Sequence, residues 1–417
     1  MIIMIKDILL AQKQELEGRF REPYIEREVH SDKLDYPLIK VIIGPRRAGK
    51  SSFALHFLNK QKKFGYVNFD DEQLIEIKEY DAILEAMNTV YDNPTYVLFD
   101  EIQNLPKWEL FVNRLQRRGI NLILTGSNSN LLSRELATHL TGRHLLISIF
   151  PFSFKEYLSR NKAALTSHQT QEQLEAFLIT GGYPEPLIKN MDYRDYLSTL
   201  FNSIIYKDII KRYKIRFPQG VENIAYYLLS NIANEYSYTN LSKMTQIKSV
   251  HTLQKYLSYL EEAFIFFSVK RFSNKLKEQI TFNQKIYCID NGFINAKAFK
   301  ITPDRGKLYE NIVAQELKKK EMDNKLRFFY WKNSQQEEVD FVIQEDMKVK
   351  QLIQVCYNLN NIDTKSREVR VLLKAGKELK CDNLLVINQE YTGEEDVEWF
   401  GIKRKVKFIP LWKWLLV

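Results

Sequence analysis

Short apolar runs alternate with amphipathic stretches in the first third of the chain. The runs at 38–43, 65–69, 95–99, 120–124 and 144–150 predict buried strands. Between them, apolar residues recur at helical spacing in 51–61, 73–89, 108–118 and 130–140. Strands that alternate with helices predict parallel βαβ units, with helices on both faces of a single sheet.

The pattern changes after Pro151, where the strand signals stop. Residues 154–158, 171–180 and 193–211 predict helices, and 239–260 predicts two helices joined by a short turn before a strand at 264–270. From 309 onward, one helix and strands near 328, 339–343 and 352–355 predict a smaller α/β domain. The expected apolar face of the helix pair consists of Leu241, Met244, Val250, Leu253, Tyr256, Leu257 and Leu260.

Length and composition indicate a soluble protein of several domains. A chain of 417 residues predicts two to four domains, and 45% hydrophobic with 27% charged residues argues against disorder. No apolar run is long enough to span a membrane, and no signal peptide is evident. Three scattered cysteines suit a reducing compartment, so we expect a cytoplasmic protein without a membrane partner. The net charge of +9 permits a nucleic-acid partner without demanding one.

A phosphate-binding loop is the strongest chemical signal in the sequence. The segment GPRRAGKS follows a predicted strand, precedes a predicted helix and fits G-x-x-x-x-G-K-[ST]. Glycines allow the backbone N–H groups to face phosphates, Lys50 would contact the β- and γ-phosphates, and Ser51 would hold Mg²⁺. The expected ATP-binding residues are Gly44, Pro45, Arg46, Arg47, Ala48, Gly49, Lys50, Ser51 and Ser52.

Two carboxylates follow the predicted strand at 95–99. Asp100 is placed to hold the Mg²⁺ through water, as the usual acidic partner of a phosphate loop. Glu101 is placed to polarise the water that attacks the γ-phosphate. The alternative for both is a solvated strand end.

Further polar residues are candidates to complete a catalytic site. Thr125, Ser127 and Asn128 follow the next strand, and each could sense the γ-phosphate, with Ser127 and Asn128 also able to cap a helix. Arg143 precedes the fifth strand and could act on a neighbouring subunit's γ-phosphate as an arginine finger. It could equally pair with Glu101 or a surface acid.

The ordered series of motifs resembles a known ATPase family. The runs GPRRAGKSS, VLFDEIQNLPKWE, LILTGSNSNLL, LTGRHLLISIFPFSFKEYL and GGYPEP resemble the AAA+/STAND-type ATPases of the "archaeal ATPase" group over nearly the whole chain. The resemblance implies an AAA+-like core with strand order 5-1-4-3-2 and a helical lid. It also implies that Pro184 lies against the nucleotide base, whereas chemistry alone indicates only a Gly-Pro turn.

The helix pair and following strand look like a winged helix, which the family also carries. Its second helix would offer Ser249, Thr252 and Lys255 to a DNA major groove. The basic residues there are sparse, so a protein-docking or lid-stabilising module is the competing interpretation.

The end of the chain resembles the PD-(D/E)xK nuclease-like domain that accompanies these ATPases. Glu310, Asp340 and Gln354 match its acidic helix residue, strand aspartate and following strand ligand. Cys356 stands where the motif has lysine, and it cannot supply a fixed positive charge. This departure favours a binding-only relic over an active nuclease, and a wrong match to the motif is the third alternative.

Together these features predict an α/β protein with a parallel-sheet AAA+-like P-loop core and a small nuclease-like C-terminal domain. We expect an N-terminal helical arm at 1–30, the ATPase core at 31–150, a helical lid at 151–216, a winged helix at 217–281 and the nuclease-like domain at 282–417. The expected function is a Mg²⁺-dependent ATPase switch that couples ATP to a protein or duplex DNA, with a homo-oligomer as a candidate assembly. The alternatives are an ATP-gated DNA-binding protein or nuclease, and a nucleotide-controlled signalling scaffold.

Overall fold

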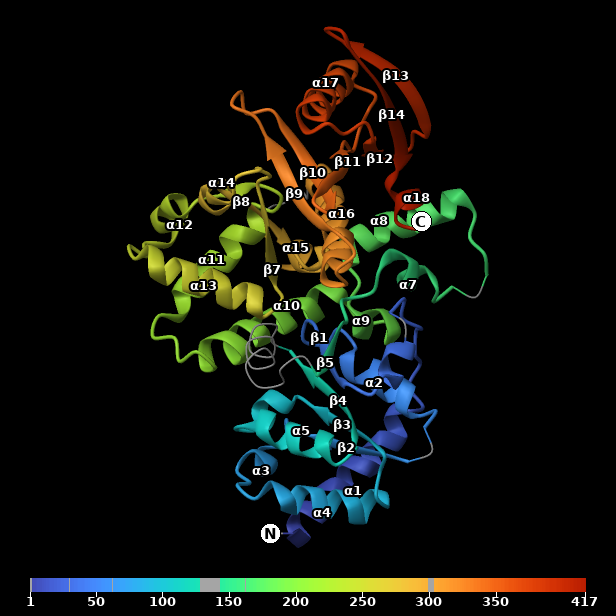
Figure 1. Ribbon diagram of the computed structural model, residues 1–417, viewed down its shortest axis with the longest axis vertical. Helices are drawn as coiled ribbons and strands as arrows, with labels where there is room; N and C mark the ends of the chain where they lie inside the picture. The colour runs from blue at the N-terminus through green and yellow to red at the C-terminus, as the bar shows by residue number, and fades with distance from the viewer. Residues whose placement is uncertain (1, 30, 62, 128–142, 162, 299–303) are drawn as a thin grey trace. The chain divides into compact units, whose positions relative to one another are not determined.

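The computed structural model describes residues 2–29, 31–61, 63–127, 143–161, 163–298 and 304–417 (Figure 1). The chain divides into two compact units. The N-terminal unit comprises Met1–Phe152 with Glu262–Phe264, and the C-terminal unit comprises Ser153–Glu261 with Ile265–Val417. The described strands form a five-stranded sheet in the first unit, and a three-stranded and a six-stranded sheet in the second.

A parallel sheet organises the N-terminal unit. Its strands lie in the order β2-β3-β4-β1-β5, and every neighbouring pair is parallel. This confirms the predicted α/β class. Counted from the opposite edge, the order is 5-1-4-3-2, as the family resemblance implied. Each predicted run overlaps its strand: β1 Ile39–Ile43, β2 Phe64–Asn68, β3 Tyr96–Asp100, β4 Asn121–Gly126 and β5 His144–Ser148.

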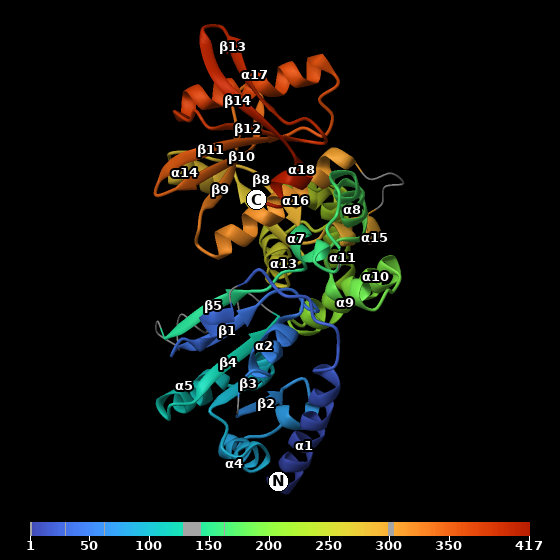
Figure 2. The ribbon, with the colours of Figure 1, turned by 90° about the vertical axis from the view of Figure 1, so that its right-hand side faces the viewer.

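Helices cover both faces of this sheet, with α2 on one face and α5 on the other (Figures 1 and 2). The single helix predicted at 73–89 is two helices, because Glu79 has a ψ of 89° and interrupts the helical backbone. The helix predicted at 130–140 lies outside the described residues. The helices are α1 Ile2–Arg19, α2 Lys50–Leu58, α3 Glu72–Ile75, α4 Tyr80–Tyr91 and α5 Trp108–Arg117, with 3₁₀ turns at Ser31–Asp35 and Ile102–Asn104.

Helices dominate the first part of the C-terminal unit. Ser153 and Glu156 form a capping box at the start of α7, and Thr166 and Gln169 form another at the start of α8. The predicted helix 193–211 begins as α-helix and continues as a π-helical stretch at Ile204–Lys211. The helices are α7 Phe154–Leu158, α8 Ser167–Thr180, α9 Pro184–Ile188, α10 Tyr193–Ser203, α11 Pro218–Ser230 and α15 Asn291–Lys297.

The predicted helix pair consists of α12 Tyr238–Thr245 and α13 Val250–Glu262. Of its expected apolar face, Leu241, Leu253, Leu257 and Leu260 are buried, but Met244 is 63% and Val250 is 49% exposed. Those two were wrong as core residues, since they flank the turn at Gln246, whose backbone is left-handed. Beside the pair lies an antiparallel sheet in the order β6-β8-β7, made of β6 Glu235–Tyr236, β7 Phe266–Lys270 and β8 Gln284–Cys288, with α14 Leu276–Thr281 before β8.

A mixed six-stranded sheet forms the end of the chain, in the order β13-β14-β12-β11-β10-β9. Helix α17 packs on it, so that Val371 and Leu372 share a buried cluster with Val339, Leu352 and Phe408 of the strands. The elements are β9 Arg327–Lys332, β10 Glu338–Glu345, β11 Lys348–Val355, β12 Leu384–Asn388, β13 Gly393–Trp399, β14 Ile402–Pro410, α16 Arg305–Met322, α17 Ile362–Leu379 and α18 Leu411–Trp414. Within the described ranges, no helix combines the length and apolar character that a bilayer crossing requires.

A buried aspartate fixes the Gly-Gly-Tyr-Pro turn before α9. The carboxylate of Asp290 accepts hydrogen bonds from Gly182 N at 2.7 Å and from Gly292 N at 2.8 Å. Gly181 has a φ of 71°, and a Cβ there would lie 1.8 Å from Asp290 Oδ1, so only glycine fits. Burial raises the pKa of Asp290 to about 7, although the two N–H groups act to lower it.

This raised pKa predicts a pH-dependent stability of the C-terminal unit. Because folded Asp290 holds its proton more tightly than the unfolded carboxyl, its contribution is complete below about pH 4 and is lost as the pH rises through about 7. Between pH 5 and 7.5, deprotonation of Asp290 should lower the unfolding free energy of the wild type by on the order of 2–4 kcal/mol. The Asp290→Asn variant should lack this part of the decrease. Denaturant unfolding at several pH values measures this. The exposed Asp346→Asn variant should keep the wild-type profile, and equal profiles for all three proteins would contradict the assignment.

Candidate functional site

The loop between β1 and α2 has the backbone that the phosphate-loop motif predicts. Gly44 has a φ of 149° and Gly49 a φ of 97°, which favour glycine at both positions. A Cβ on Gly44 would lie 1.9 Å from the carbonyl oxygen of Ile149, so a side chain is sterically excluded there. The N-terminus of α2 follows directly at Lys50, and such helix ends favour anions.

Lys50 is folded back onto this loop. Its ammonium group donates to the carbonyl oxygens of Gly44 at 3.1 Å and Pro45 at 2.8 Å, and the residue is only 4% exposed. The lysine is therefore held at the loop itself, in the position from which it can reach an anion bound by the loop.

Hydroxyl groups from several strands and the loop converge on the carboxylate of Asp100. Ser51 donates to Asp100 Oδ1 at 2.7 Å, Tyr66 donates to Oδ2 at 3.1 Å, and Thr125 also donates to Oδ1. Asp100 ends β3, so this one carboxylate links the loop with β2 and β4. The structure thus brings together Ser51 and Asp100, the two expected Mg²⁺ ligands.

Glu101 lies immediately beyond the strand and has a left-handed backbone, with a φ of 51°. Its N–H donates to Thr125 Oγ1 at 3.0 Å. Its carboxylate accepts from Ser127 Oγ at 3.3 Å and from Gln103 Nε2. Glu101 is therefore oriented by both its backbone and its side chain.

The two neighbouring carboxylates have opposite electrostatics. Burial, followed by the charge of Glu101, raises the pKa of Asp100. Burial acts to raise the pKa of Glu101 as well, but the charge of Lys50 and the hydrogen bond from Gln103 outweigh it and lower that pKa. Glu101 therefore carries the negative charge of the pair most readily, as a base requires.

The remaining residues expected to act on ATP lie in several places along the chain. Arg46 lies 4.0 Å from Asp70 in an ion pair. Arg143 is exposed just before β5, where its carbonyl oxygen accepts from Ile39 N. Ser127 contacts Glu101, and Asn128 lies outside the described residues. Pro184 belongs to the C-terminal unit, where it begins α9.

Several residues at this site carried no signal in the sequence. Tyr66 reaches Asp100 from β2, and Arg19 of α1 donates to the Tyr66 hydroxyl at 3.0 Å. Arg27 donates to the loop carbonyl of Ala48 at 3.3 Å. Only the strand order could have indicated Tyr66, since β2 adjoins β3 in the sheet.

The three residues matched to a nuclease motif do converge in the C-terminal unit. Gln354 Oε1 accepts from Asp340 N at 3.3 Å, while Asp340 and Glu310 both accept from Lys285 Nζ, at 3.2 and 2.8 Å. Lys285, on β8, was missed because nothing near it in the sequence indicates a site. Burial alone would lower the pKa of Lys285, but the negative charge of Glu310 and its neighbours raises it well above its usual value.

Cys356, where the nuclease motif has lysine, is 6% exposed. Burial, followed by the charge of Glu368, raises the pKa of its thiol to about 11. The side chain is therefore a neutral thiol at physiological pH.

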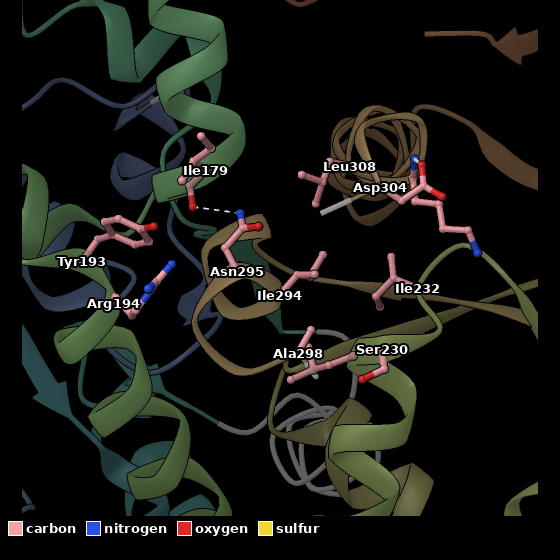
Figure 3. Close-up of a pocket in the computed structure, with 12 residues that line it drawn as sticks. Ile179, Tyr193, Arg194, Ser230, Ile232, Ile294, Asn295, Ala298, Asp304 and Leu308 are labelled. Carbon is pink, nitrogen blue, oxygen red and sulfur yellow. Dashed lines mark hydrogen bonds between the residues drawn. The ribbon is translucent and has the colours of Figure 1, made fainter. Parts of the chain in front are cut away.

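A separate cavity of about 240 Å³ lies among the helices of the C-terminal unit (Figure 3). Two of its polar side chains make hydrogen bonds: Asn295 Nδ2 donates to the carbonyl oxygen of Ile179 at 2.9 Å, and Lys307 Nζ donates to Asn234 at 2.5 Å. None of the residues expected from the sequence to have a function lines it. The lining consists of Ile179, Tyr193, Arg194, Leu229, Ser230, Ile232, Ile294, Asn295, Ala298, Asp304, Lys307 and Leu308.

Models of three protein families match successive parts of the chain. An AAA domain matches residues 36–158, which contain the loop, Asp100 and Glu101. Two domains of unknown function, DUF8612 and DUF4143, match residues 171–305 and 305–414.

Two solved structures have a partial similarity to the chain. The Walker-type ATPase PABY2304 of Pyrococcus abyssi has a TM-score of 0.44 and 18% identity, covering 66% of this chain and 96% of that one. DnaA from Aquifex aeolicus bound to AMPPCP has a TM-score of 0.26 and 15% identity, covering 55% and 83%. Both scores are below 0.5, so the fold assignment depends on the sheet order, the loop and the AAA family model.

The hydroxyl of Tyr66 should stabilise the N-terminal unit. Removing it in Tyr66→Phe deprives buried Asp100 of a donor and Arg19 of its acceptor, which should lower the unfolding free energy by about 1–3 kcal/mol. Denaturant unfolding measures the change. Tyr36→Phe removes an exposed hydroxyl and should leave stability unchanged, and an equal effect of both variants would contradict the role of Tyr66.

One relative matches nearly the whole chain and establishes the family. The uncharacterized protein MJ1544 of Methanocaldococcus jannaschii is 34% identical over 99% of this chain and 95% of its own length. An uncharacterized protein of Haemophilus influenzae is 29% identical over 71% of this chain and 78% of its own length. The chain belongs to the same family as MJ1544 and carries an AAA-type P-loop domain at residues 36–158, which supports nucleotide binding.

Proposed function

We propose that the protein is a Mg²⁺-dependent ATPase switch whose nucleotide state controls a partner. The observation that carries this proposal is the hydrogen bond of 2.7 Å between Ser51 of the phosphate loop and Asp100 at the end of β3. It joins the loop to the acidic strand end, with Glu101 as the next residue. Residues 44–52 would form the ATP-binding loop.

Ser51 and Asp100 fit a Mg²⁺ ion, because they place a hydroxyl and a carboxylate side by side at the loop. When bound, the ion would neutralise charge on the β- and γ-phosphates. Lys50 would exchange its two loop carbonyls for phosphate oxygens, a stronger pairing of opposite charges.

Glu101 would accept a proton from the attacking water. Its lowered pKa keeps it ionised at neutral pH, and Gln103 and Ser127 hold its carboxylate in place. Because Ser127 contacts this carboxylate, we assign it the sensor role, which Asn128 would share. Arg143 is exposed and would act in trans as the finger of an adjoining subunit.

Substitution of Glu101 should separate binding from turnover. Glu101→Gln keeps the shape of the side chain but removes the base, so ATP should bind with wild-type affinity while turnover falls at least about 100-fold. Lys50→Ala should instead weaken ATP binding by about 10- to 100-fold, through loss of a charge-assisted contact. Fluorescent-nucleotide binding and phosphate release measure the two effects.

The control is Glu76→Gln, an exposed position on the same unit, which should change neither quantity. Normal hydrolysis by Glu101→Gln would show that another group is the base.

Pro184, in the proposed lid at 151–216, would lie against the nucleotide base.

Duplex DNA is a candidate partner for the proposed winged helix. Lys243, Lys248 and Lys255 are exposed on and between α12 and α13, and no acidic residue occurs from Tyr238 to Leu260. An exposed positive stretch without carboxylates suits contact with phosphates.

The double variant Lys248→Gln/Lys255→Gln should weaken DNA binding similarly for all sequences. The slope of log affinity against log salt concentration should fall by about 2, one for each lost phosphate contact. Fluorescence anisotropy across a salt series measures it, with Lys60→Gln/Lys78→Gln on the other unit as the charge-matched control. Absence of DNA binding, with a nucleotide-dependent change in oligomer size, would favour the signalling scaffold instead.

A further inference from the structure

Four charged side chains meet inside the C-terminal unit, and we name them the Lys285 cluster. Lys285 Nζ lies 2.8 Å from Glu310 Oε1, 2.5 Å from Glu338 Oε1 and 3.2 Å from Asp340 Oδ1. The side chain of Lys285 is 2% exposed and that of Asp340 is 8% exposed. A single ammonium group therefore pairs with three carboxylates in a mostly dry environment.

The acidic members are fixed by further hydrogen bonds. Tyr287 donates to Glu310 Oε1 at 2.7 Å, and Val355 N donates to Asp340 Oδ2 at 2.9 Å. The side-chain amide oxygen Oε1 of Gln354, the expected metal ligand, accepts from Asp340 N at 3.3 Å. These contacts orient the carboxylates towards Lys285.

A divalent metal does not fit the Lys285 cluster as the structure has it. Mg²⁺ or Ca²⁺ binds oxygens at about 2.0–2.6 Å, so it would have to occupy the region between Glu310 and Asp340. The ammonium of Lys285 already lies at contact distance from both. Across the described residues, no group of three or more histidine, cysteine or acidic side chains is arranged to hold a metal ion.

We infer that Lys285 takes the place of a divalent metal in this acidic centre, so that the C-terminal unit depends on an internal cation and uses no metal there. The cation comes from β8 of the three-stranded sheet, while the carboxylates come from α16 and from β10 of the six-stranded sheet. The ion pairs therefore join the two sheets of this unit. Cys356 replaces the lysine of the nuclease motif, but Lys285 still supplies a positive charge to the acidic centre. It does so at the place between the carboxylates where a metal would bind.

Counting Mn²⁺ ions tests this inference on the full, nucleotide-free chain. Electron paramagnetic resonance of free Mn²⁺ should give the same number of bound ions for the wild type and for Asp340→Asn, because the cluster holds none. Lys285→Ala should bind one ion more than the wild type, and Lys285→Ala/Asp340→Asn should lose it. Lys350→Ala, an exposed lysine on β11, should match the wild type.

Thermal unfolding gives a second readout. Lys285→Ala should unfold at a lower temperature than the wild type, and Mn²⁺ should restore several degrees in this variant alone. If Asp340→Asn binds one Mn²⁺ ion fewer than the wild type, the cluster holds a metal beside Lys285 and the inference is wrong. A folded Lys285→Ala that gains no ion also overturns it. If Lys285→Ala does not fold, the comparison of the wild type with Asp340→Asn decides.

Discussion

The buried carboxylate of Asp100 is the constraint on which the N-terminal unit's site depends. Three hydroxyl groups, from the phosphate loop, β2 and β4, satisfy it. A buried carboxylate without such partners would be costly, so the loop and three strands must keep their register at this point. The same bonds place Ser51 beside Asp100, and Thr125 links Asp100 to the backbone of Glu101.

The C-terminal unit also contains a buried charge that needs partners, but the charge there is positive. Lys285 is buried and would be destabilising alone, but three carboxylates surround it. Asp290 shows a third solution, in which backbone N–H groups satisfy a buried acid at the Gly-Gly-Tyr-Pro turn. Each case joins segments distant in sequence, so buried charges specify how these segments pair.

Local patterns predicted the strands of the first sheet and the loop, because in βαβ units the segments that lie close in space are also close in sequence. The strand order came from the family resemblance and is confirmed. The split between α3 and α4 was missed, because the apolar spacing continues through Glu79 although the helical backbone is interrupted there. Strands β12 to β14 were also missed. Tyr66 and Lys285 belong to no motif, and their partners lie 34 and 25 or more residues away, so only the strand order pointed to Tyr66 and nothing pointed to Lys285.

The close approach of Gly44 to Ile149 has a mechanical consequence. With the carbonyl of Ile149 where a side chain would begin, the start of the loop has no room to move towards β5. The backbone there is held in place, whereas the Lys50 side chain can exchange its loop carbonyl acceptors for a ligand. Recognition of a phosphate would then require one side chain to change rotamer, and the fold itself could stay still.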